Sequence, residues 1–224
     1  MKPFLNLAEA RAPDGALMSL HSKAGHYFLR VDGEALMATN APESERVLAE
    51  VACEGLRHQP NVRVLIGGLG FGFTLRRTLE LLGPEAVVTV GELTSIIVDW
   101  NREYLGDLSG HSLDDPRVRI RVNDVVNLIK GAAEGSLDAI MLDVDNGPNA
   151  MVAAGNARLY GMKGLASIRR SLKPGGRLAI WAAVRDAQFP KAFARAGFRV
   201  DVVAARATAS AKRCAHTIFL GQKL

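Results

Sequence analysis

A glycine-rich turn is the first feature of this sequence that suggests chemistry. Gly68, Gly70 and Gly72 lie in the stretch VLIGGLGFGFTL, where an apolar run meets a helical pattern. A glycine turn between a strand and a helix lets the backbone approach a ligand closely. The dinucleotide fingerprint GxGxxG requires a glycine where Phe73 stands, which argues against a nicotinamide or flavin cofactor. Tight packing of the strand on the helix is the alternative explanation for the glycines.

Acidic residues follow three later apolar runs. Glu92 lies about 20 residues beyond the glycines, where an acid that accepts both hydroxyls of a ribose is expected. A solvent-exposed glutamate at a strand end is the alternative. Asp124 is suited to contact an adenine amino group or to cap a helix from Val125. Because Asp143 and Asp145 follow a further apolar run, four runs end in glycines or acids, which predicts one ligand site.

Alternating strands and helices would bring these residues together. The apolar pattern predicts strands at 62–66, 86–90, 118–122, 137–142 and 177–181, and helices at 74–82, 96–104, 125–130 and 164–172. Continuous apolar strands that alternate with helices indicate a parallel sheet covered on both faces. The carboxyl ends of such strands share one edge, where ligands bind. The glycines and acids are therefore expected at that edge.

The two ends of the chain differ from this alternating pattern. Residues 26–39 contain two strand-like runs around Asp32 and Gly33, a dipeptide that suits a tight hairpin turn. Residues 198–221 contain two further strand-like runs joined by a small, basic loop, which predicts an antiparallel hairpin. Both ends are therefore expected to add antiparallel strands to the α/β arrangement.

The length of 224 residues is sufficient for one α/β domain with a full core. The content of 48% hydrophobic and 23% charged residues is ordinary for a globular protein. The expected fold is α/β and Rossmann-like, with a mostly parallel seven-stranded sheet, a C-terminal antiparallel hairpin and a small N-terminal hairpin. Residues 1–42 are expected to form the N-terminal hairpin segment and residues 43–224 the Rossmann-like domain.

Charge, cysteine spacing and hydropathy argue against several classes of function. The formal net charge is +5, but the basic residues are scattered and do not alternate with aromatic residues, so nucleic-acid binding is disfavoured. Cys53 and Cys214 have neither CxxC nor Cys/His spacing, and the five histidines match no metal or triad spacing, so no metal is expected. No apolar run reaches membrane-spanning length and the start lacks a signal-peptide core, so we expect a cytoplasmic protein without a membrane partner.

Several motifs together resemble those of the spermidine/spermine synthase family, within the class I S-adenosylmethionine-dependent methyltransferase fold. They are VLIGGLGFGFTLRR, VTVGEL, DDPRVRIRVND, LDAIMLDVDNGP and LYGMKGLASIRRSLKPGGRLAIW. FLRVDGEALM also resembles the end of that family's N-terminal β-domain. The resemblance implies that the ligand is S-adenosylmethionine or its decarboxylated form. It assigns donor contacts to Gly68, Gly70, Gly72, Glu92, Leu93, Asn123, Asp124 and Asp143.

The sequence departs from the family pattern at several substrate-contacting positions. Members that transfer an aminopropyl group carry an acid within the glycine motif, where this chain has Phe71. Leu36, Asn146, Leu165 and Trp181 stand at family positions of a Gln, an Asp, a Tyr and a Gln. Loss of the acid at position 71 would remove repulsion against a donor carboxylate, which predicts that ordinary S-adenosylmethionine is accepted.

These departures favour one function over two others. The main prediction is a methyltransferase for a small amine or hydroxyl compound, with Asp143 and Asp145 as candidate catalytic residues: Asp143 positions the reactants and Asp145 is the candidate base. Turn formation is the alternative role of Asp145. Asn146, Tyr160 and Trp181 are predicted to bind the acceptor, although the two aromatic residues suit the core equally. The alternatives are an aminopropyltransferase that makes spermidine from decarboxylated S-adenosylmethionine and putrescine, and a noncatalytic nucleoside-binding protein. The family's mode of assembly implies a homodimer.

Overall fold

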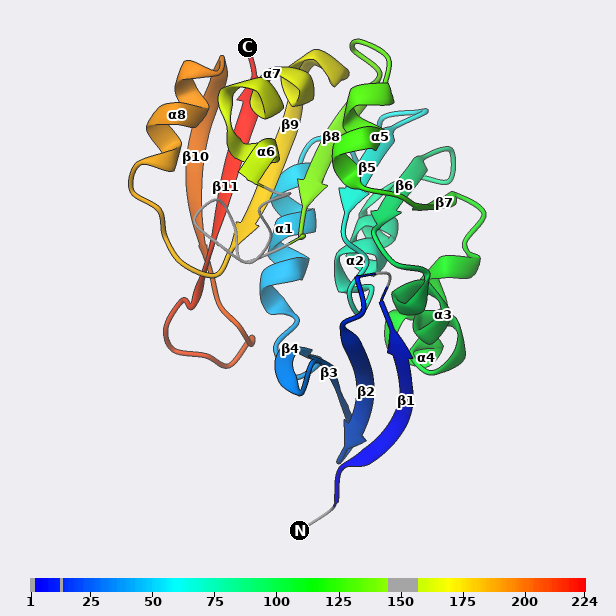
Figure 1. The fold of residues 1–224 in the computed structure, drawn as a ribbon. Coiled ribbons are helices and arrows are strands. Elements are labelled where there is room, and N and C mark those ends of the chain that lie inside the picture. Colours follow the sequence, from blue (N-terminus) through cyan, green and yellow to red (C-terminus); the bar gives the residue numbers. More distant parts are fainter. Residues whose placement is uncertain (1–2, 13, 145–156) are drawn as a thin grey trace.

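The computed structural model describes residues 3–12, 14–144 and 157–224. It contains two sheets, an N-terminal antiparallel sheet and a larger sheet that carries helices on both faces (Figure 1). The N-terminal sheet lies beyond the edge at which the parallel strands of the larger sheet end (Figure 1). The predicted ligand edge therefore faces the N-terminal part of the chain.

The N-terminal sheet has the order β1-β2-β3-β4, and its neighbouring strands are antiparallel. Its strands are β1 (Leu5–Arg11), β2 (Leu17–Lys23), β3 (His26–Val31) and β4 (Glu34–Ala38). The predicted hairpin turn is confirmed: Asp32 and Gly33 join β3 to β4 with φ angles of 49° and 82°, as a primed two-residue turn requires. β1 and β2 extend this hairpin to four strands, which the sequence pattern does not predict.

The larger sheet has the order β10-β11-β9-β8-β5-β6-β7. Its strands are β5 (Arg63–Gly67), β6 (Val87–Glu92), β7 (Val118–Val122), β8 (Leu137–Leu142), β9 (Leu172–Ala182), β10 (Phe198–Ala205) and β11 (His216–Lys223). β7, β6, β5, β8 and β9 run parallel, and β11 is antiparallel to both β9 and β10. The predicted seven-stranded sheet with a C-terminal antiparallel hairpin is therefore confirmed. β5 has β6 on one side and β8 on the other, which makes its carboxyl end the switch point where such sheets bind ligands.

Helices cover both faces of this sheet (Figure 1). They are α1 (Glu43–Cys53), α2 (Phe73–Leu81), α3 (Ser95–Glu103), α4 (Gly106–Ser109), the 3-10 turn η1 (Ser112–Asp114), α5 (Val125–Gly131), α6 (Ala157–Tyr160), α7 (Met162–Ser171) and α8 (Phe189–Arg195). Successive strand residues point to opposite faces. On β8, Met141 packs in the cluster that contains α1, α2 and α3 residues, whereas Ile140 and Leu142 pack with α5, α7 and α8. Among the described residues, every helix is too short or too polar to cross a membrane.

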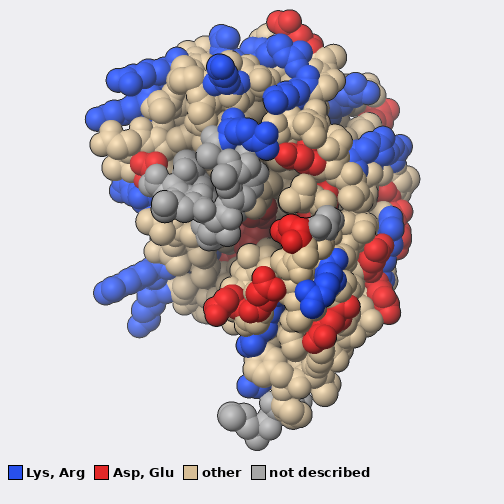
Figure 2. All heavy atoms as spheres, viewed as in Figure 1, with Lys and Arg blue, Asp and Glu red and all other residues tan. Residues whose placement is uncertain are grey.

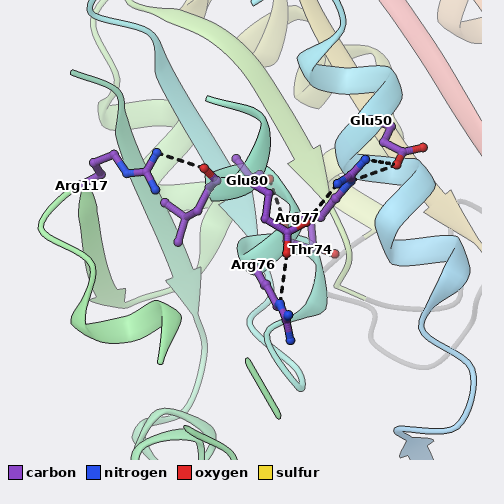
Figure 3. A network of polar contacts seen from close by, with 8 residues as sticks. Glu50, Thr74, Arg76, Arg77, Glu80 and Arg117 are labelled. Atoms are coloured by element: carbon purple, nitrogen blue, oxygen red, sulfur yellow. Dashed lines mark hydrogen bonds and ion pairs between the residues drawn. The ribbon is translucent and has the colours of Figure 1, made fainter. Parts of the chain in front are cut away.

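An ion pair fixes α1 against α2. Arg77 donates to Glu50 Oε1 from Nη2 at 2.6 Å and from Nε at 2.9 Å, while its Nη1 donates to Glu80 Oε2 at 3.0 Å (Figure 3). Leu48, on the same helix as Glu50, is fully buried in the core cluster beneath it. The ion pair and the buried Leu48 thus both hold α1 in place against its neighbours.

Candidate active site

The glycine turn begins where β5 ends, and Gly68 brings it against the end of β8. Gly68 has a φ of 88°, and a Cβ atom at this position would collide with the backbone carbonyl oxygen of Asp143. Its N–H donates to the carbonyl oxygen of Gly91 on β6 at 2.8 Å, so the turn is tied to the neighbouring strand as well. Only a residue without a side chain allows this close approach of β5 and β8 in a left-handed conformation.

The other two glycines of the turn pack against different elements. A Cβ atom at Gly70 would lie 3.2 Å from the Cε atom of Met37 on β4, so the N-terminal sheet covers this part of the turn. At Gly72, which precedes α2, it would lie 3.1 Å from Ser109 Cβ and 3.4 Å from Asn101 Oδ1. Gly72 also has a φ of 80°, so a residue with a side chain would be strained there whatever the space. Contact of all three glycines with a donor stays a prediction.

Glu92 joins the end of β6 to the glycine turn. Its Oε2 accepts a hydrogen bond from the Leu69 N–H at 3.0 Å, and its Oε1 accepts from the Thr94 N–H at 3.1 Å. The residue is only 8% exposed, so the alternative of a solvent-exposed glutamate is wrong. Burial raises the pKa of this carboxyl, although the two amides act in the opposite direction. Each carboxylate oxygen has a second acceptor position, which leaves the side chain able to bind ribose hydroxyls.

An apolar surface lies beside Glu92. Leu93, the next residue, is 74% exposed, and Val122 is 54% exposed at the position paired with Glu92 on β7. Exposed apolar side chains at the carboxyl ends of two adjacent strands suit the face of a nucleoside base. The predicted donor contact of Leu93 is compatible with this position.

Asn123 and Asp124 follow β7 and have local partners. Asp124 Oδ1 accepts from the Val126 N–H at 2.8 Å, so this side chain caps α5, and its Oδ2 lies 3.8 Å from a guanidinium nitrogen of Arg158. Asn123 donates its N–H to the carbonyl oxygen of Glu92 at 2.9 Å and accepts from the Asn127 side chain. The capping role is observed, and contact of either residue with adenine stays a prediction.

Asp143 lies at the centre of this edge. Its N–H donates to the carbonyl oxygen of Gly67 at 2.9 Å, and its Oδ2 accepts from Thr74 Oγ1, in the first turn of α2, at 3.0 Å. Removal from water raises the pKa of the Asp143 carboxyl to about 7, and the negative charge of Glu45 acts in the same direction. Unlike an ordinary aspartate, this side chain therefore exchanges a proton near neutral pH.

Glu45 is a site residue that the sequence analysis missed. It lies in the first turn of α1, is only partly exposed, and accepts a hydrogen bond from the buried Ser44 hydroxyl at 2.6 Å. Burial raises its pKa, and its carboxylate interacts electrostatically with that of Asp143. The stretch APESER reads as an ordinary helix start, and only the packing of α1 over β8 brings Glu45 to this edge. Figure 2 shows acidic side chains around a hollow in the middle of one face of the molecule.

Trp181 lies beside Asp143 on the α1 face of the sheet. Met141 pairs with Ala179, so the residues two positions further along β8 and β9 are Asp143 and Trp181. Trp181 in turn pairs with Ile218 of β11, two residues from His216. The Trp181 and His216 rings are 4.9 Å apart between centroids and inclined at 37°. Extending the β8–β9 register by one residue thus puts the Asp143 carboxylate on the same face as the two contacting rings.

Three further predicted residues lie elsewhere or are not described. Tyr160 is 8% exposed and packs edge-on against Phe189, with ring centroids 6.1 Å apart, in the cluster on the opposite face of the sheet from Asp143. This packing corresponds to the core role given as its alternative. Asp145 and Asn146 lie outside the described residues. In the described ranges, no group of three or more His, Cys, Asp and Glu side chains is arranged to hold a metal ion.

Comparison with known proteins gives matches over most of the chain. The spermine/spermidine synthase domain matches residues 44–184. The polyamine aminopropyltransferase of Mycobacterium tuberculosis (strain H37Rv) is 34% identical over 121 residues, which are 53% of this chain and 22% of that protein. Polyamine aminopropyltransferase 1 of Hyperthermus butylicus is 30% identical over 207 residues, which are 84% of this chain and 69% of that protein. The chain thus spans about a fifth of the mycobacterial relative.

Solved structures share the fold. The crystal structure of spermidine synthase from Thermotoga maritima superposes with a TM-score of 0.73 at 16% identity, and the match covers 98% of this chain and 72% of that one. The crystal structure of human methyltransferase-like protein 13 superposes with a TM-score of 0.59 at 19% identity, covering 80% of this chain and 79% of that one. The two likenesses confirm the predicted Rossmann-like fold.

The comparisons contradict the prediction of methyl transfer, because the matching relatives are named as polyamine aminopropyltransferases. That prediction depended on Phe71 lying beside the donor in place of an acid. In the structure Phe71 is only 6% exposed and packs in the core, with its ring centroid 6.5 Å from that of Phe73. Meanwhile α1 supplies a carboxylate, Glu45, next to Asp143. An acid thus reaches this edge from α1, an element outside the glycine motif.

Proposed function

The chain belongs to the spermine/spermidine synthase domain family, and from this we propose that it transfers an aminopropyl group from decarboxylated S-adenosylmethionine to an amine. The observation that carries the proposal is the electrostatic interaction of the Asp143 and Glu45 carboxylates, both only partly exposed, at the carboxyl edge of the sheet. Two neighbouring carboxylates raise each other's pKa and are stabilised by a cation between or beside them. The proposed donor supplies that cation.

The charges of the two possible donors differ in the part that would face these carboxylates. Decarboxylated S-adenosylmethionine carries a sulfonium and a terminal ammonium, whereas S-adenosylmethionine carries a carboxylate beside its ammonium. A donor carboxylate next to Asp143 and Glu45 would be repelled in a site of low effective dielectric. This electrostatic selection supports the aminopropyl donor.

The reaction requires orientation and one proton acceptor. The lone pair of an acceptor amine attacks the propyl carbon bonded to the sulfonium, the new C–N bond forms as the C–S bond breaks, and the bonding pair returns to sulfur. Methylthioadenosine leaves as a neutral thioether, and the new ammonium gives up one proton. Asp143, with its pKa near 7, is suited to take that proton at neutral pH. Glu92 would hold the ribose, and Leu93 would line the base.

Product identity tests the proposal. The purified protein is incubated with either decarboxylated or ordinary S-adenosylmethionine and a set of alkylamines, and the nucleoside product is identified by mass spectrometry. We expect methylthioadenosine from the decarboxylated donor. Formation of S-adenosylhomocysteine from the ordinary donor, without methylthioadenosine from the other, would overturn the proposal.

A pair of glutamate variants isolates the electrostatic argument. We expect Glu45→Gln to lower kcat/KM for the decarboxylated donor by about tenfold, because one charge-assisted contact is removed from a poorly hydrated site. Glu85→Gln, at an exposed position between α2 and β6, serves as the matched control and should leave kcat/KM unchanged. Equal values for the two variants would show that Glu45 does not select the donor.

The same proposal includes a small-molecule acceptor, a homodimer and a cytoplasmic location. The small-molecule acceptor is the amine whose lone pair attacks the propyl carbon in the reaction described above. The homodimer and the location stay predictions, and light scattering of the purified protein tests the first.

A further inference from the structure

We infer that the acceptor is a monoamine whose far end carries an uncharged hydrogen-bonding group, such as a hydroxyl or carboxamide, and that Trp181 and His216 bind this group. The inference depends on the proposed aminopropyl transfer, because it identifies the second substrate of that reaction. A diamine acceptor would instead require a second anionic contact at its far end, to compensate for the lost hydration of a second ammonium.

The position of the Trp181–His216 pair relative to Asp143 is the first support. Trp181 is the lateral neighbour of Asp143 on the α1 face, and His216 lies next to Trp181 on the far side, at the start of β11. An acceptor whose amine lies at Asp143 and whose chain runs along the sheet edge therefore reaches the two rings with its other end. The order of strands β8, β9 and β11 places the three side chains in this lateral order.

The second support is a pair of unmatched polar atoms. Trp181 Nε1 and His216 Nδ1 are both buried and have no hydrogen-bond partner among the described residues. A buried polar atom without a partner is destabilising and is rare in native proteins. Two such atoms on rings in contact, beside the candidate catalytic aspartate, indicate a group that arrives with the substrate.

The third support is the chemistry that these atoms can recognise. The indole N–H of Trp181 only donates, and burial lowers the pKa of His216, so its imidazole is neutral and offers one nitrogen as an acceptor. A hydroxyl or carboxamide accepts from Trp181 and donates to His216. An alkylammonium has no lone pair, so it would leave the Trp181 N–H unmatched. The pair therefore fits an uncharged end better than a charged one.

Two exposed side chains of β4, near the glycine turn, are apolar. Leu36 is 56% exposed and Met37 is 37% exposed, and Met37 contacts Gly70. Leu36 stands where related sequences are expected to have a glutamine, and Trp181 replaces a second glutamine. Among the described residues, Asp143 and Glu45 thus contribute carboxylates to this edge, whereas Leu36, Met37, Trp181 and His216 contribute apolar or neutral side chains.

Binding of three compounds of equal chain length tests the inference. Putrescine, aminobutanol and butylamine share a four-carbon chain and differ only in the ammonium, hydroxyl or hydrogen bonded to its last carbon. Each is titrated calorimetrically into the full chain saturated with methylthioadenosine. We expect aminobutanol to bind about tenfold more tightly than either of the others, the effect of one to two matched hydrogen bonds.

Variants test whether the Trp181 and His216 rings cause the preference for aminobutanol. In Trp100→Phe, Trp181 is the single tryptophan, so a change in its fluorescence locates the bound compound at that ring. Trp181→Phe and His216→Phe should each abolish the preference for aminobutanol over butylamine while retaining butylamine binding. His58→Gln, at an exposed histidine, is the matched control. Melting curves exclude unfolding, and His216→Phe decides the question where Trp181→Phe does not fold.

The outcomes separate this inference from the proposed function. Tighter binding of putrescine than of aminobutanol, or no binding of the three, would overturn the inference whatever the reaction is. A preference for aminobutanol that the two ring variants abolish supports it. Failure to release methylthioadenosine from the decarboxylated donor with any amine would instead overturn the proposed function, and this is measured in a separate assay.

Discussion

Asp143 and Glu45 change each other's chemistry, and this determines the expected pH dependence. Asp143 accepts a hydrogen bond from Thr74, which favours its ionised form, while burial and the charge of Glu45 favour its protonated form. A base that accepts a proton must be ionised first. The rate at saturating substrates should therefore fall as the pH drops below about 7.

Two substitutions should move this low-pH fall in rate, the acidic limb of the pH–rate profile, in opposite directions. Glu45→Gln removes a negative neighbour, lowers the pKa of Asp143 and shifts the limb to lower pH. Thr74→Val removes a hydrogen bond to the carboxylate, raises the pKa and shifts the limb to higher pH. Profiles of kcat against pH measure both shifts, with the exposed Glu85→Gln as control. Limbs that coincide in all variants would show that another group titrates.

At the scale of elements, the glycine turn is the most constrained connection, because it joins β5 to α2 while touching the end of β8. The constraint at Gly68 has two parts: a positive φ and the absence of space for a side chain. Gly55, after α1, has a similar φ of 81°, but no atom lies within 4 Å of the position that a Cβ atom would take there. The two positions therefore allow strain and collision to be separated.

Alanine substitution should reveal this difference. Gly55→Ala introduces only the strain of a left-handed alanine, about 1–2 kcal/mol. Gly68→Ala adds a collision with the Asp143 carbonyl, so we expect a larger loss of unfolding free energy and displacement of the candidate catalytic aspartate. Urea denaturation measures the first effect and donor affinity the second. Equal losses in the two variants would mean that the end of β8 moves aside freely.

At the scale of the whole molecule, acids with raised pKa values affect stability. Burial raises the pKa of Glu45, Glu92 and Asp143 above their values in an unfolded chain, near 4. Between that value and the folded pKa, the folded state binds more protons, so a rise in pH favours unfolding. Asp143 therefore makes the protein less stable as the pH rises from about 4 to about 7, and Glu45 and Glu92 act in the same direction above about pH 4.

Urea denaturation at pH values across this window tests the linkage. Asp143→Asn cannot ionise, so the free energy of unfolding of this variant should decrease less with rising pH than that of the unchanged protein. Asp99→Asn, at an exposed position on α3, should show the unchanged dependence. An identical pH dependence in all three proteins would contradict the assigned cause.

Much of this architecture could be predicted from the sequence, because its signals are local. Apolar runs predict the parallel strands, and the rule that strand ends share an edge predicts the meeting of Gly68 with Asp143. The place of Glu45 could not be predicted, since it depends on how α1 packs over β8. The contact of Trp181 with His216 likewise depends on the register of an antiparallel strand that returns from the end of the chain. The buried position of Phe71 could not be predicted either, because it depends on how the core packs.

The paired carboxylates also bear on how a catalytic cycle would end. In the proposed reaction the sulfonium becomes a neutral thioether, and the terminal ammonium leaves with the lengthened acceptor. The nucleoside that stays behind has lost both charges that Asp143 and Glu45 attract. The chemical step itself thus weakens retention of the spent nucleoside, so a fresh cationic donor displaces it readily and product inhibition by methylthioadenosine is kept low.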